Sequence, residues 1–157
     1  MKFKSLIAEF GLRYGIGKLV PDADGVVGIG VDDRSVTFRR QGESDCVVAL
    51  AELGDVPETG ADAVNRLLMQ VNQALFIEDG LVITRPEKSG RYCLLDRMDV
   101  ASMDFLGFDR RISRLLAQAD RWSAFLERYI PLAAEAATAG DSPEPFHESA
   151  SLDMMRV

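Results

Sequence analysis

The residues that could support chemistry in this chain occur in patterns that fall short of known catalytic and metal-binding motifs. The segment from Gly15 to Lys18 resembles part of a phosphate-binding loop, but it follows a helical pattern and has no Ser or Thr after the lysine. Aspartates near two turns suggest a cation site, yet the spacing of a calcium-binding loop with its distant glutamate is absent. Acids at such positions usually form turns. They are Asp22, Asp24, Asp32 and Asp33.

Histidine and cysteine give no stronger indication of catalysis. His147 is the only histidine and lies near the carboxyl end, where we expect a mobile segment, so a packed catalytic base is not predicted. Cys46 and Cys93 lie in apolar, strand-like runs without a CxxC spacing, which favours buried thiols. The sequence therefore predicts a protein that is not an enzyme and has no metal or cofactor.

Length and charge restrict the class of protein and of partner. A chain of 157 residues with 47% hydrophobic content suits one domain plus a tail. From Pro131 onward five acids face one base, so this end carries −4 of the net charge of −7. Neither part has the basic excess that nucleic acid requires. The longest apolar runs are far shorter than the roughly 20 residues of a membrane span, so we expect a soluble cytoplasmic protein.

Hydrophobic periodicity predicts an α+β domain in which a helix, three strands, a helix, two strands and a helix follow one another (αβββαββα). The first helix carries an apolar stripe from Phe3 to Tyr14 and ends at Gly15 and Gly17. We expect a twisted antiparallel sheet packed by the helices, with the first two strands forming a hairpin.

Glycines distinguish the first strand. Val27, Ile29 and Val31 alternate with Gly28 and Gly30, so one face of this strand has no side chains. Another backbone could approach closely on such a strand.

Capping signals place the later helices. Thr59, with Asp62 three residues on, resembles a capping box before the second helix. Ser102 is the predicted cap of the long last helix, which Pro131 perturbs. From residue 133 the sequence is rich in Ala, Gly, Pro, Ser and acidic residues, which predicts a mobile segment. Whether the last helix extends into this segment is not decided by the sequence.

Several residues along this frame resemble one family. The run from Val47 to Pro57 (VVALAELGDVP), the pair Leu67-Leu68 followed by Asn72, and Trp122 near the end of the last helix are together similar to class I type III secretion chaperones of the Tir chaperone (CesT) family. The resemblance covers roughly Phe3 to Tyr129. The glycine-rich first strand and the acidic carboxyl-terminal extension depart from the family pattern.

The resemblance implies a homodimer in the bacterial cytoplasm that binds the extended amino-terminal segment of a secreted effector. Such a chaperone keeps the segment soluble and secretion-competent and helps deliver it to the secretion apparatus. Residues 1–132 would form the chaperone domain and residues 133–157 a flexible acidic tail. The alternative is a small-ligand-binding enzyme or a regulatory protein that shares this fold.

The predicted sites come partly from the residues and partly from the resemblance. A sheet with a free edge can accept an added strand, and apolar pockets beside it can accept alternate side chains. The predicted effector-binding residues are therefore on the first helix and first hairpin: Phe3, Leu6, Ile7, Phe10, Ile29, Val36 and Phe38. The family forms its dimer through the second helix and the following strand, which implies an interface of Val64, Leu68, Val71, Leu75, Leu81 and Ile83. Periodicity alone does not decide whether these residues face the core or a partner.

Overall fold

The structure is a computed structural model that describes residues 2–42, 44–87 and 89–140. Within these residues the elements are α1 (Lys2–Arg13), β1 (Val26–Val31), β2 (Arg34–Arg40), β3 (Cys46–Asp55), α2 (Ala61–Asp79), β4 (Leu81–Thr84), β5 (Arg91–Asp99) and α3 (Phe105–Ala139). The strands form one antiparallel sheet in the order β1-β2-β3-β5-β4. The αβββαββα order and the antiparallel sheet predicted from the sequence are confirmed.

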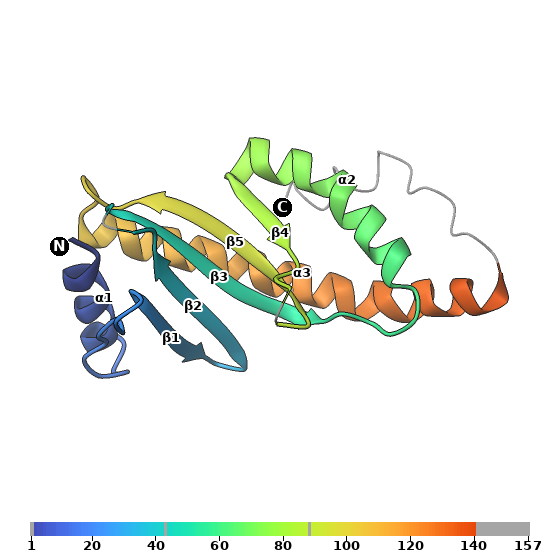
Figure 1. Ribbon diagram of the computed structural model, residues 1–157, viewed down its shortest axis with the longest axis horizontal. Helices are drawn as coiled ribbons and strands as arrows, with labels where there is room; N and C mark the ends of the chain where they lie inside the picture. The colour runs from blue at the N-terminus through green and yellow to red at the C-terminus, as the bar shows by residue number, and fades with distance from the viewer. Residues whose placement is uncertain (1, 43, 88, 141–157) are drawn as a thin grey trace.

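Helix α3 crosses behind the sheet, while α1 lies beside β1 and β2 and α2 lies beside β4 (Figure 1). Because side chains alternate along a strand, one face of the sheet turns its apolar residues toward α1 and α3. Three aromatic rings join the layers: the Phe108 centroid lies 6.1 Å from that of Phe38 on β2 and 6.1 Å from that of Phe10 on α1. This face forms the core of the molecule.

One ion pair is built into that face. Asp96 on β5 is fully buried, and Arg111 on α3 donates to both its carboxylate oxygens, from Nε at 2.7 Å and from Nη2 at 2.6 Å. The hydrogen bond to Asp96 raises the pKa of Arg111. A buried carboxylate is tolerated when a guanidinium pairs with both oxygens, so this contact fixes α3 on the sheet.

The two cysteines are buried and form no disulfide, as the sequence predicted. Burial raises the pKa of the Cys93 thiol. Both therefore act as small apolar core residues.

The ends of the helices differ from the sequence-based expectation. The cap of α3 is Asp104, whose Oδ1 accepts from Gly107 N at 2.7 Å, and not Ser102. Helix α2 begins after Gly60 without a side-chain cap, so Thr59 does not form the expected capping box. Ser102 and Asp104 are both good caps two residues apart, and periodicity cannot choose between them.

Helix α3 also continues through Pro131 as far as Ala139. The residues that follow the proline are mainly alanine, the strongest helix former, and Ala133 is buried. The last helix therefore does extend beyond residue 132. The predicted boundary between the domain and the tail, at residue 132, lies inside this helix. The remainder of the predicted acidic tail, with His147, lies outside the described residues.

Candidate functional site

The first edge of the sheet is β1, and its hydrogen-bonding pattern follows from its register with β2. Arg40 N donates to Gly25 O at 3.0 Å, so the pair of residues 25 and 40 is hydrogen bonded. In an antiparallel ladder such pairs alternate with non-bonded ones. Val27, Ile29 and Val31 therefore bond to β2, opposite Phe38, Val36 and Arg34. The main-chain N–H and C=O groups of the intervening residues, Val26, Gly28 and Gly30, lie in the plane of the sheet and point away from β2.

Two of those outward residues are glycines with no strand beside them. The outward main-chain groups of Val26 are already hydrogen bonded to Asp22. The Oδ1 of Asp22 accepts from Val26 N at 2.9 Å, and the main-chain N of Asp22 donates to Val26 O at 2.8 Å. Within the described part of the chain, no hydrogen bond reaches the outward groups of Gly28 and Gly30. A Cβ added at either glycine would meet nothing within 4 Å. The edge is thus open both to hydrogen bonding and to close approach.

An apolar groove of about 260 Å³ lies beside this edge, between α1, α3 and β1. Phe10 from α1 and Tyr14, which directly follows this helix, form one wall, with rings 4.6 Å apart between centroids. Its lining is Phe10, Tyr14, Ile16, Gly30, Val31, Ile112, Ser113 and Leu116. A strand added to β1 would direct alternate side chains into this groove.

Polar contacts hold the α1 wall against α3. Tyr14 Oη donates to Asp109 Oδ1 at 2.6 Å, and this hydrogen bond raises the pKa of the tyrosine. The guanidinium of Arg13 lies 4.1 Å from the centre of the Phe105 ring. Both contacts are exposed, so they orient α1 more than they stabilise the fold.

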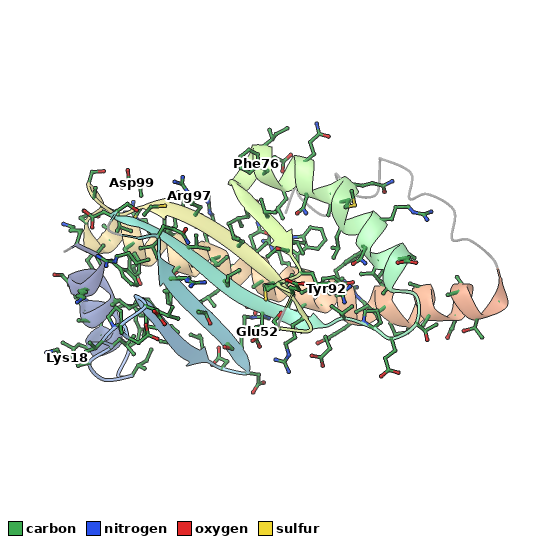
Figure 2. The ribbon with its side chains drawn as sticks, viewed as in Figure 1. Lys18, Glu52, Phe76, Tyr92, Arg97 and Asp99 are labelled. Carbon is green, nitrogen blue, oxygen red and sulfur yellow. The ribbon has the colours of Figure 1, made fainter. Side chains whose placement is uncertain are left out.

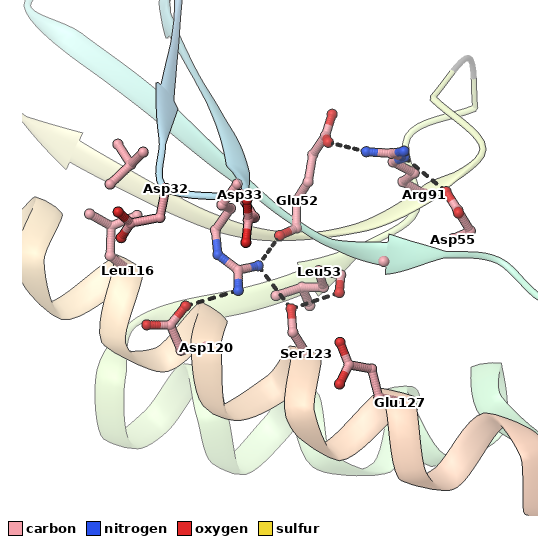
Figure 3. A pocket seen from close by; sticks show the side chains of 13 residues that line it. Asp32, Asp33, Glu52, Leu53, Asp55, Arg91, Leu116, Asp120, Ser123 and Glu127 are labelled. Carbon is pink, nitrogen blue, oxygen red and sulfur yellow. Dashed lines mark hydrogen bonds and ion pairs between the residues drawn. The ribbon is translucent and has the colours of Figure 1, made fainter. Parts of the chain in front are cut away.

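A second pocket, of about 470 Å³, lies beneath the tip of the β1–β2 hairpin (Figure 3) and shares Val31 and Leu116 with the groove. Arg34 reaches from the hairpin to α3, where it donates to Ser123 Oγ at 2.8 Å and to Asp120 Oδ1 at 2.9 Å. It also donates to Glu52 O. The Arg34 side chain therefore connects the hairpin to β3 and α3.

The second pocket is strongly acidic. Six carboxylates and two guanidinium groups line it, which leaves a net charge of −4. Arg91 bonds Glu52 at 2.6 Å and Asp55 at 2.8 Å, and the hydrogen bond to Glu52 is the main cause of its raised pKa. The remaining carboxylates, on Asp32, Asp33 and Glu127, have no ion pair or hydrogen bond among the described residues.

The opposite edge of the sheet is closed by a side chain. Asn72 on α2 accepts from Ile83 N at 2.7 Å through Oδ1 and donates to Ile83 O at 2.9 Å through Nδ2. The amide thus takes the place of a neighbouring strand at the centre of β4. A strand adding to this sheet meets open main-chain groups at β1 and an occupied residue at β4.

The residues predicted to bind an effector are all buried within the chain. Phe3, Leu6, Ile7 and Phe10 face the sheet and α3, and Ile29, Val36 and Phe38 lie on the inner face of the hairpin. Phe10 alone also lines the groove. The groove residues outside that prediction are Tyr14, Ile16, Gly30, Val31, Ile112, Ser113 and Leu116. Tyr14 belongs to the apolar stripe that the sequence shows, which was the available signal for it.

The residues predicted to form a dimer interface are buried as well. Val64, Leu68, Val71, Leu75, Leu81 and Ile83 all belong to the core cluster. The exposed apolar residues of α2 lie on its other side: Met69, Phe76 and Ile77 are 77%, 61% and 72% exposed. Phe76, labelled in Figure 2, lies at the end of α2 that adjoins β4.

Two arginines on the outer side of α3 donate to main-chain oxygens: Arg114 Nη2 to Asp79 O at 2.7 Å and Arg128 Nε to Ala124 O at 3.0 Å. Among the described residues, no group of three or more His, Cys, Asp or Glu side chains is arranged to hold a metal ion. No helix in the described ranges is long and apolar enough to cross a membrane.

Known proteins share this architecture. One chain of the ExsC–ExsE complex is 25% identical, with a TM-score of 0.72 over 80% of this chain and 93% of that one. A chain of the ExoU–SpcU complex of Pseudomonas aeruginosa is 21% identical, with a TM-score of 0.58 over 80% and 98%. The Yersinia pestis type III secretion chaperone SycH, in complex with a fragment of YscM2, gives 18% identity and a TM-score of 0.56 over 74% and 96%.

No curated protein sequence matches the chain. The family model that matches is that of the Tir chaperone protein (CesT) family, over residues 5–123. This match runs from within α1 to the middle of α3 and includes the open edge and every lining residue of the two pockets except Glu127. The chain therefore belongs to the Tir chaperone (CesT) family and has the fold of type III secretion chaperones.

Proposed function

We propose that this type III secretion chaperone holds an extended amino-terminal segment of a secreted effector along the edge of β1. The observation that carries the proposal is the open main chain of Gly28 and Gly30 beside an apolar groove of about 260 Å³. Main-chain hydrogen bonds to the two glycines would align the segment, and the groove would receive alternate apolar side chains. The similar structure of HopA1 with SchA is a chaperone–effector complex, and that of ExoU with SpcU is a heterodimeric complex from a type III secretion system.

The proposed activity is binding and includes no catalytic step. A bound segment would be kept extended and soluble until it reaches the secretion apparatus, and the chaperone would act in the bacterial cytoplasm. Ordering a disordered segment costs several kcal/mol of contact energy, so both the main-chain bonds and the apolar groove are needed.

The seven effector-binding residues predicted from the sequence would support this site as part of the hydrophobic core beneath it. They pack the inner face of the first hairpin and the sheet-facing side of α1. In that position six of them support the groove from within the core, and Phe10 also lines it. The segment would contact Phe10 and the other lining residues.

We also propose that two copies associate through the exposed side of α2. Met69, Phe76 and Ile77 form an apolar surface there. Because Asn72 occupies the middle of the neighbouring β4 edge, the copies would meet through side chains and not by joining their sheets.

The test of effector binding is co-expression with the first ~100 residues of a large secreted protein encoded next to this chain, a length set by ordinary interface size. Size-exclusion chromatography with light scattering should detect a soluble complex. The variant Gly30→Pro removes the outward N–H donor and should abolish the complex, since proline blocks strand addition at an edge. Gly30→Ala keeps the donor and has open space for its methyl group, so it is the matched control. Equal binding by both variants would contradict the proposal.

A further inference from the structure

The apolar groove and the acidic pocket are two parts of one surface. Val31 and Leu116 line both of them, one from β1 and one from α3. A segment that lies along β1 and extends toward the hairpin tip would therefore pass from the apolar groove to the adjacent acidic pocket.

Strand geometry sets the spacing of the side chains that would enter the two pockets. Residues two apart on a strand point to the same face and lie about 7 Å apart. If one side chain fills the groove beside Gly30, the next on that face lies toward the tip, over Leu116 and the acidic pocket. A long side chain at that position would reach the carboxylates beneath the tip.

The negative charge of the second pocket favours a positively charged side chain at that position of the bound segment. Arg34 pairs with Asp120, and Arg91 pairs with both Glu52 and Asp55. The carboxylates of Asp32, Asp33 and Glu127 remain uncompensated among the described residues. Asp32 and Asp33 lie at the hairpin tip, and Glu127 lies on α3 beyond Ser123 (Figure 3). A lysine or arginine of the segment would be attracted by these unpaired carboxylates, whereas an acidic side chain would be repelled by them.

We propose that the β1 surface selects extended segments in which an apolar residue and a lysine or arginine stand two positions apart. The inference rests on the proposed function and specifies which segments the open edge accepts. The apolar residue supplies the contact with the groove formed by Tyr14, Ile112 and Leu116. The basic residue fixes the register, because a shift by one residue turns it away from the acidic pocket.

The chain's own carboxyl-terminal segment does not fit this description. Residues 141–157 contain four acids and one arginine. The pocket carries −4, so the same charge that favours a basic effector segment disfavours this acidic one.

The test is selection of binders from a random 12-residue peptide library displayed on phage, with the full chain as bait. Selected peptides should be enriched in lysine or arginine two positions from an apolar residue. Enrichment on the amino-terminal or the carboxyl-terminal side of that residue would establish which way the segment runs, and either supports the proposal.

Synthetic peptides then test the pocket directly. A selected peptide and its Lys→Gln version are titrated into the wild type and into the triple variant Asp32→Asn, Asp33→Asn, Glu127→Gln. We expect the triple variant to bind the lysine peptide about tenfold more weakly and the glutamine peptide unchanged. The matched control, Glu58→Gln, Glu87→Gln, Glu135→Gln, removes the same charge from exposed positions elsewhere and should bind both peptides like the wild type.

The outcomes separate the two proposals. If peptides lose binding to Gly30→Pro but show no basic preference, the edge site stands and the inference about the acidic pocket is wrong. If the triple variant binds the lysine peptide like the wild type, the inference is also wrong. If Gly30→Pro binds the selected peptides unchanged, or the library gives no binder, the edge site fails and the inference fails with it.

Discussion

Asn72 bonds both main-chain groups of Ile83, at 2.7 and 2.9 Å, and so the two edges of this sheet are in opposite states. At β4 a side chain from α2 satisfies the outward N–H and C=O groups of Ile83, in the middle of the strand. At β1 the corresponding groups of Gly28 and Gly30 are open. Exposed edges invite uncontrolled pairing, and covering one edge leaves a single place where an extended partner can add.

The first prediction concerns this closure. Asn72→Leu should lower the free energy of unfolding by about 1–3 kcal/mol, because it leaves a donor and an acceptor of Ile83 without partners. Urea unfolding followed by circular dichroism measures the loss. The control is Gln70→Leu, at an exposed position of the same helix with no hydrogen bond among the described residues. Equal stability of the two variants would show that the amide contributes nothing to the edge.

The second prediction concerns the proposed association of two copies. Phe76→Asp should give a folded monomer, because the aspartate would have to be desolvated at an apolar contact, at a cost of several kcal/mol. Light scattering gives the mass and circular dichroism checks the fold. Leu106→Asp replaces another exposed large apolar residue, on α3, and should leave the dimer intact. A Phe76→Asp dimer would exclude this side of α2 from the interface.

Leu68→Asp and Leu81→Asp should behave differently from Phe76→Asp. Both leucines are buried against the chain's own core, so a charge there should unfold the protein instead of only separating its copies. The distinction separates core residues from interface residues.

The sequence predicted the order of elements because period and turn chemistry are local properties. The apolar stripe of α1 and the alternation along β1 depend only on neighbouring residues. The sequence could not divide these residues between core and partner, since a stripe looks the same in either role. Phe3 and Phe38 were therefore proposed as binding residues and lie in the core.

The acidic pocket could not be predicted, because it is assembled across the chain. Asp33 lies in the first hairpin, Asp55 at the end of β3 and Glu127 on α3, and no local pattern relates them. The role of Asn72 was also hidden: its position was noted only as part of a family pattern, and its partner is eleven residues away. Both features depend on tertiary packing.

The third prediction concerns the buried ion pair. Arg111→Met should lower the free energy of unfolding by about 3–5 kcal/mol, because it leaves the buried carboxylate of Asp96 without a partner. The double variant Asp96→Leu, Arg111→Met removes both charges and should recover most of that loss. Arg110→Met, at the adjacent exposed position, is the control. Additive losses in the double variant would mean that the two side chains are not coupled.

The last prediction concerns the contact between Gly60 and the end of α3. Gly60 has a φ of 79°, and a Cβ there would lie 2.7 Å from the carbonyl carbon of Ala133. Gly80 has a similar φ of 68° but open space around it, so Gly80→Ala carries the left-handed strain without the clash. We expect Gly60→Ala to be the more destabilising of the two by urea unfolding.

Truncation tests whether Ala133 is the cause of that difference. In a chain shortened after Ile130 the clash cannot occur, so the two alanine variants should lose stability equally. Residues 131–139 would then be part of the folded domain, because their packing constrains the loop before α2. If Gly60→Ala stays the more destabilising variant in the shortened chain, the cause lies in the loop itself and not in its contact with α3.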